Sequence, residues 1–167
     1  MVIILMGVSG CGKTTVGREL QLLLSWDFFD ADDYHPQENV EKMSAGTPLT
    51  DEDRKPWLEG LAKEIRNWNT GGGNAILACS ALKGVYRKML GVDQKSVVTV
   101  FLKGDFDLLA ERLQNRKGHY MPPNLLRSQL DTLEEPDDGL VFNIRLSPAV
   151  IAKNITMQLA LRNYDFS

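Results

Sequence analysis

Features that define several classes of proteins are missing or scarce in this chain of 167 residues. Two cysteines, Cys11 and Cys79, are too few for a disulfide framework and lack the spacing of metal ligands. No apolar run approaches the ~20 residues that span a bilayer, and Met1 leads directly into a core strand rather than a cleavable leader. The net charge of −3 argues against a nucleic-acid groove, which needs clustered positive charge. We therefore expect a cytoplasmic protein without membrane or nucleic-acid partners.

The residues that are present are typical of one globular domain. Hydrophobic residues make up 43% of the chain and charged residues 25%, which is ordinary for a folded protein. Short apolar stretches typical of strands alternate with stretches of helical periodicity, and the strands are expected at 2–6, 26–30, 75–79, 96–102 and 140–144. This alternation predicts an α/β fold over residues 1–167, with a five-stranded parallel sheet covered by helices on both faces.

The most informative stretch joins the first strand to the first helix and reads Gly-x-x-x-x-Gly-Lys-Thr. Its glycines let the backbone curl so that successive N–H groups point at a polyphosphate, and the helix N-terminus adds partial positive charge. Lys13 would reach the β- and γ-phosphates, and the hydroxyl of Thr14 would coordinate Mg²⁺. The pattern predicts a P-loop that binds a nucleotide through Gly7, Val8, Ser9, Gly10, Cys11, Gly12, Lys13, Thr14 and Thr15.

The two cysteines carry different expectations. Cys79 ends an apolar strand and is expected to be a small buried residue. Cys11 lies inside the anion-binding loop, where we expect it to be more exposed and its thiolate to be favoured by the backbone dipoles. Oxidation-sensitive activity is the hypothesis that follows.

Acidic residues follow the second strand. In an open parallel sheet the ligand lies at the carboxyl ends of the strands, so Asp30 and Asp32 are expected beside the P-loop. Phosphoryl transfer to a hydroxyl needs one carboxylate near that hydroxyl and another that holds magnesium waters. A solvated acidic turn is the alternative interpretation.

Three further segments carry weaker predictions. Thr50 caps a helix whose regular part is expected to start near Arg54, or to kink there, because of Pro56. The glycines at 71–73 precede the third strand and are interpreted as a turn. The basic, proline-ended stretch at 116–123 is typical of a lid that closes over the phosphoryl group, with a solvated helix end as the alternative.

The assembled motifs resemble one family, the gluconate kinases, which are small P-loop kinases related to shikimate kinase. The resemblance covers nearly the whole chain, including Asp30 to Pro36, Pro48 to Leu58, Cys79 to Lys83, and Arg116 to Tyr120. The segments that specify the family are His-Pro at 35–36, Asp-Arg-Lys-Pro-Trp at 53–57 and Cys-Ser-Ala-Leu-Lys at 79–83. It implies transfer of the ATP γ-phosphoryl group to the 6-hydroxyl of D-gluconate, with Mg²⁺ as cofactor and a homodimeric enzyme.

The resemblance also implies roles for individual residues. Lys13, Asp32 and Arg116 would be catalytic, and Asp30 would hold magnesium through water together with Thr14. Arg112 resembles an arginine that stacks on adenine, and Arg116 resembles a phosphate-gripping lid residue. The acid substrate would be bound by Asp32, His35, Arg54, Lys83 and Arg87.

Two departures from related kinases and two rival functions remain. The glycines at 71–73 precede the third strand instead of following it, and that strand lacks a terminal aspartate for magnesium.

A kinase of another hydroxy acid, such as shikimate, would share the P-loop but not Asp-Arg-Lys-Pro-Trp. A non-catalytic ATP-binding module is the rival from another class, whereas the Asp-x-x-Gly and Asn-Lys-x-Asp motifs of regulatory GTPases do not occur.

Overall fold

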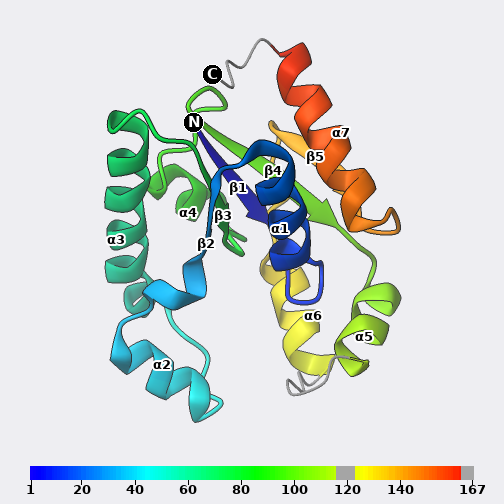
Figure 1. The fold of residues 1–167 in the computed structure, drawn as a ribbon. Helices are drawn as coiled ribbons and strands as arrows, with labels where there is room; N and C mark the ends of the chain where they lie inside the picture. Colours follow the sequence, from blue (N-terminus) through cyan, green and yellow to red (C-terminus); the bar gives the residue numbers. More distant parts are fainter. Residues whose placement is uncertain (116–122, 163–167) are drawn as a thin grey trace.

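The computed structural model describes residues 1–115 and 123–162, and its centre is a parallel sheet with helices on both faces (Figure 1). The five strands lie in the order β2-β3-β1-β4-β5, and every neighbouring pair is parallel. Their bounds are β1 (Val2–Met6), β2 (Asp27–Asp30), β3 (Ala75–Ala78), β4 (Val97–Lys103) and β5 (Leu140–Asn143). The predicted single-domain α/β fold is confirmed.

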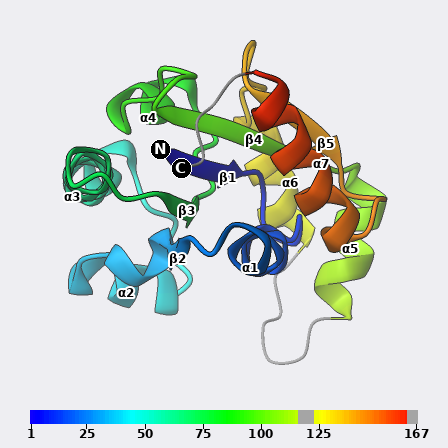
Figure 2. The ribbon, with the colours of Figure 1, turned by 45° about the horizontal axis from the view of Figure 1, so that its top comes forward.

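Two apolar layers hold the helices against the sheet. Alternate side chains of β1 point to opposite faces, so Ile3 and Leu5 belong to one layer and Ile4 to the other. Figure 2 shows α3 and α4 on one side of the sheet and α1 and α7 on the other. The helices are α1 (Lys13–Leu24), α2 (Gln37–Ser44), α3 (Asp51–Thr70), α4 (Gly84–Met89), α5 (Phe106–Gln114), α6 (Pro123–Thr132) and α7 (Pro148–Leu161), and a 3₁₀ helix, η1, covers Ala31–Tyr34.

Thr50 caps α3 as predicted, but the regular helix starts earlier than expected. The helix begins at Asp51 rather than near Arg54, and Pro56 lies within it. A capping box explains the earlier start, because Asp53 N–H donates to the Thr50 hydroxyl and Thr50 N–H donates to the Asp53 carboxylate. These bonds satisfy backbone donors of the first turn, and the helix forms despite the proline.

The carboxyl ends of β1, β2 and β3 meet at one edge of the sheet. β1 leads into the P-loop, β2 leads into η1, and β3 leads to Ser80, whose carbonyl accepts a hydrogen bond from Gly7 N–H. The 71–73 turn lies at the other ends of the strands, where the amino group of Met1 donates to the Gly73 carbonyl. Within residues 1–115 and 123–162, no helix is both long and apolar enough to cross a bilayer.

Candidate active site

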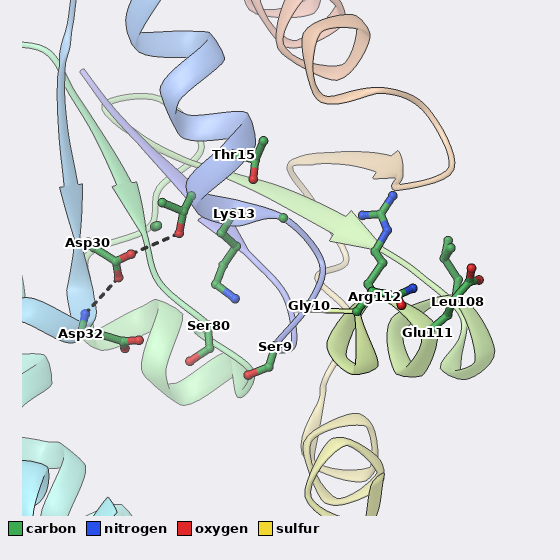
Figure 3. A pocket seen from close by; sticks show the side chains of 14 residues that line it. Ser9, Gly10, Lys13, Thr15, Asp30, Asp32, Ser80, Leu108, Glu111 and Arg112 are labelled. Atoms are coloured by element: carbon green, nitrogen blue, oxygen red, sulfur yellow. Dashed lines mark hydrogen bonds between the residues drawn. The ribbon is translucent and has the colours of Figure 1, made fainter. Parts of the chain in front are cut away.

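A cavity of about 670 Å³ opens at this carboxyl edge (Figure 3). It collects side chains from the P-loop, from the turn after β2, from the end of β3 and from α5. The lining residues are Ser9, Gly10, Gly12, Lys13, Thr14, Thr15, Asp30, Asp32, Ala78, Ser80, Leu108, Glu111, Arg112 and Asn115. Phosphate-binding loop and carboxylates therefore face the same space.

The P-loop has the backbone conformation that its glycines allow. Gly10 and Gly12 have φ angles of 83° and 94°, in the left-handed region that L side chains rarely adopt. The loop curls around the Lys13 side chain, whose ammonium donates to the carbonyls of Gly7 at 2.9 Å and Val8 at 3.2 Å. These hydrogen bonds hold the Lys13 side chain in the lining of the cavity (Figure 3).

The expectation of an exposed Cys11 is wrong. Its side chain is 1% exposed and packs in the same apolar layer as Leu109 and Leu113 of α5. Its sulfur lies only 2.9 Å from the point where a Cβ on Gly7 would stand. Because an oxidation-sensitive thiol must be accessible, the structure removes the basis of the redox hypothesis. Cys79 is buried as expected, and burial raises the pKa of its thiol to about 12.

Asp30 connects the P-loop to the acidic turn. The Thr14 hydroxyl donates to one of its carboxylate oxygens at 3.3 Å, and the backbone N–H of Asp32 donates to the other at 3.2 Å (Figure 3). Hydroxyl and carboxylate oxygens are hard ligands of the kind that Mg²⁺ takes from proteins, one or two at a time beside water and phosphate. No cluster of three or more metal-binding side chains occurs among the described residues.

Asp32 has a perturbed carboxyl group. Desolvation by the surrounding wall of the cavity and the neighbouring charge of Asp30 raise its pKa, while His35 and Lys13 act in the opposite direction. The side chain lines the cavity, and 88% of its own surface remains open to solvent. A carboxylate with a raised pKa that lines a cavity is a stronger base than an ordinary aspartate and is accessible to a substrate.

His35 supports the acidic turn from behind. Its ring stacks on Trp57 with centroids 4.2 Å apart, and its Nε2 lies 3.9 Å from an oxygen of Asp32. The Trp57 indole N–H in turn donates to the Ala31 carbonyl at 2.8 Å. Burial lowers the pKa of His35, and Arg54 lowers it further against the pull of Asp32, which favours the neutral ring. These contacts fasten η1 to α3.

The cations predicted to bind the substrate do not line the cavity. Arg54 and Lys83 instead converge on the carboxylate of Asp51 at the start of α3, and Lys83 Nζ lies 2.7 Å from its Oδ2. Arg87 donates to the carbonyls of Ala81 and Leu82. Sequence reasoning missed Asp51, although its position beside Thr50 in an acidic first turn was visible as a helix-start signal.

The opposite wall of the cavity comes from α5. Arg112 lines it and donates through Nη2 to the Ile144 carbonyl at 2.6 Å. Ser80 and Glu111 also line the cavity, and neither was assigned a role from the sequence. From α6, Gln129 accepts a hydrogen bond from the backbone N–H of Ser9 at 2.8 Å. Arg116 lies outside the residues that the structure describes. Of the predicted lid at 116–123, the structure describes only Pro123, the first residue of α6.

Comparison with known proteins relates this arrangement to kinases. The shikimate kinase family matches residues 9–141. A probable gluconokinase of Xenopus tropicalis is 50% identical over 151 residues, covering 81% of this chain and 80% of the relative. The thermosensitive gluconokinase of Escherichia coli K12 is 46% identical over 155 residues, covering 93% and 83%. The crystal structure of a gluconokinase from Sinorhizobium meliloti 1021 superposes with a TM-score of 0.77 at 36% identity, covering 94% and 96%.

Proposed function

The chain belongs to the gluconokinases of the shikimate kinase family, and from that premise we propose that it transfers the γ-phosphoryl group of ATP to the 6-hydroxyl of D-gluconate. The products are 6-phospho-D-gluconate and ADP. The observation that carries the proposal is the meeting of the P-loop and the Asp30–Asp32 turn in one cavity. A non-catalytic ATP-binding module has no use for an accessible carboxylate of raised pKa at that position.

Each reacting atom has a residue suited to it. Asp32 accepts the proton of the 6-hydroxyl, whose oxygen forms the new bond to the γ-phosphorus as the bond to ADP breaks. Lys13, now bonded to two P-loop carbonyls, turns its ammonium to the β- and γ-oxygens and offsets the charge that develops there. Arg112 faces the nucleotide from α5, and we keep Arg116 as a proposed second cation on the phosphates.

Thr14 and Asp30 fit a magnesium ion bound with ATP. Their oxygens are 3.3 Å apart in the lining of the cavity, and both are hard donors. Thr14 would hold the ion directly and Asp30 through water. When bound, Mg²⁺ neutralises phosphate charge and orients the γ-phosphoryl group for in-line transfer.

The sugar acid would extend from Asp32 toward the start of α3. Its carboxylate needs cations, and Arg54, Lys83 and Arg87 are the candidates, with His35 beside the hydroxyl-binding carboxylate. Arginine binds a carboxylate with two parallel hydrogen bonds, which gives orientation as well as affinity. This placement leaves the 6-hydroxyl, at the far end of the acid, facing Asp32 and the P-loop.

Product analysis tests the proposal. The enzyme is incubated with ATP, Mg²⁺ and D-gluconate labelled with ¹³C at carbon 6, and phosphorus–carbon coupling locates the new ester. We expect coupling at carbon 6. An ester at any other carbon would mean that the acid binds in a different orientation, and the roles given to Arg54 and Lys83 would then be wrong.

The remaining proposals rest on the family resemblance. We propose a single catalytic domain over residues 1–167 with a lid at 116–123, acting in the cytoplasm as a homodimer. Light scattering coupled to gel filtration measures the oligomeric state. A mass near 18.7 kDa, that of one chain, would contradict the dimer.

A further inference from the structure

One carboxylate organises the cations proposed to bind the sugar acid. Both oxygens of Asp51 accept hydrogen bonds from the Lys83 ammonium, at 2.9 and 2.7 Å, and Oδ1 also accepts one from the Tyr86 hydroxyl. Arg54 Nη1 lies 3.8 Å from Oδ1. The ring of Tyr86 lies beneath both cations, with its centroid 5.5 Å from Lys83 Nζ and 6.0 Å from the Arg54 guanidinium carbon. Residues from α3 and α4 thus form one cluster around Asp51.

Asp51 is the shared partner of the cations and the hydroxyl in this cluster. It is the first residue of α3, where the helix dipole favours a negative charge. Tyr86, whose hydroxyl contacts it, is 7% exposed and anchored in the apolar layer beneath α3. Hydrogen bonds from Lys83 and Tyr86 lower the pKa of Asp51, so it stays ionised at neutral pH. The Asp51 carboxylate therefore holds the Lys83 ammonium by hydrogen bonds and attracts the Arg54 guanidinium, whose Nη1 also donates to the Leu49 carbonyl.

The cluster is continuous with the acidic turn. Arg54 and Trp57 lie about one turn apart on α3, and the Trp57 ring stacks on His35 with centroids 4.2 Å apart. His35 lies 3.9 Å from Asp32. The helix that carries Asp51 and Arg54 thus also supports the turn of the proposed base.

The cations retain hydrogen-bonding capacity toward a ligand. The Lys83 ammonium has three N–H donors, and it donates to both oxygens of the Asp51 carboxylate beside the Tyr86 ring. Arg54 has five donors and directs Nη1 at the Leu49 carbonyl, 2.6 Å away. One carboxylate beside two cations leaves a net charge of +1, which matches a singly charged acid.

We propose that Asp51 is a positioning residue for substrate recognition: it holds Lys83 and Arg54 in the orientation that receives the carboxylate of the sugar acid. The inference rests on the proposed function and deepens it. Asp51 is not among the residues that line the cavity of the P-loop and Asp32, so its removal should affect the KM for the acid and not the chemical step.

Steady-state kinetics of Asp51→Asn tests this role, with Glu52→Gln as matched control. Both variants remove one negative charge from the first turn of α3, but the Glu52 carboxylate forms no hydrogen bond or ion pair with the described residues. We expect Asp51→Asn to raise the KM for gluconate roughly three- to tenfold. This is the effect that the loss of exposed hydrogen bonds to a charged group typically has. The kcat and the KM for ATP should stay within about twofold, and Glu52→Gln should match the parent.

A second variant keeps the test decisive if Asp51→Asn folds poorly. Tyr86→Phe removes only the hydroxyl that contacts Asp51, and we expect a smaller rise in the KM for gluconate. An unchanged or lowered KM in a folded, active Asp51→Asn enzyme would overturn the positioning role, because a lowered value would make Asp51 a competitor of the substrate. A parent enzyme that phosphorylates no sugar acid would instead overturn the proposed function itself.

Discussion

Two helical glycines should respond in opposite ways to the same substitution. Gly17 lies within α1, and a Cβ built there would stand 2.1 Å from Phe28 Cε2 and 2.6 Å from its Cδ2. Gly60 lies within α3, and a Cβ there meets nothing within 4 Å. Alanine is favoured over glycine in a helix interior by about 0.5–1 kcal/mol. Gly60→Ala should therefore stabilise the protein by about that amount.

At Gly17 the clash outweighs this gain. Overpacking a tight site costs typically about 1–3 kcal/mol, so we expect Gly17→Ala to be destabilising by a net of roughly 1–2 kcal/mol. For a chain of this size, each kcal/mol lost from the free energy of unfolding lowers the melting temperature by about 2–4 °C. We therefore expect Gly17→Ala to lower the melting temperature by roughly 2–8 °C. The activity should fall as well, because Phe28 lies on β2 two residues before Asp30, and a displaced β2 moves that carboxylate away from Thr14.

Thermal unfolding of the parent and both variants measures this difference. The double variant Gly17→Ala/Phe28→Leu supplies the control, since a smaller side chain at position 28 removes the atoms that clash. We expect it to be more stable than the sum of the two single changes predicts. If Gly17→Ala raised the melting temperature as much as Gly60→Ala, the close packing of β2 against α1 would be refuted.

Three further predictions concern the site. Lys13→Ala should lower kcat by at least about 100-fold through loss of transition-state charge stabilisation, and a kcat near that of the parent in the ADP-release assay would contradict its role. Asp32→Asn should lower kcat roughly 10²–10⁴-fold while nucleotide binding measured by calorimetry stays unchanged, whereas Asp33→Asn should retain activity. Desolvation and the charge of Asp30 raise the pKa of Asp32, so this carboxylate takes up its proton at a higher pH than an ordinary aspartate does. The kcat/KM of the parent enzyme should therefore begin to fall, as the pH is lowered, before the pH reaches the pKa of an ordinary aspartate, and a pH–rate profile measures this fall.

Local patterns made much of the fold predictable. The strand, glycine loop and helix from Val2 to Leu24 follow from short-range chemistry, since the loop glycines Gly7, Gly10 and Gly12 have the positive φ angles that let the backbone curl. The placement of Asp30 and Asp32 beside the loop followed from one topological rule about parallel sheets. These features depend little on the details of side-chain packing.

Features that depend on contacts between distant residues were not predictable. The pairing of Asp51 with Lys83 joins residues 32 positions apart, and only the packing of α4 beside α3 brings them together. Cys11 was misjudged because its burial depends on α5, nearly 100 residues later in the chain. The start of α3 was misplaced because a proline signal was weighed above a capping box.

The central claim is tested most directly by a coupled assay of ADP release with ATP and Mg²⁺, in which the acceptor is gluconate, shikimate, glucose or none. We predict rapid turnover with gluconate and only background rates with the other acceptors. Comparable turnover with shikimate, or a rate that is independent of every acceptor in a protein shown to bind ATP, would contradict the account of the substrate site while leaving the P-loop assignment intact.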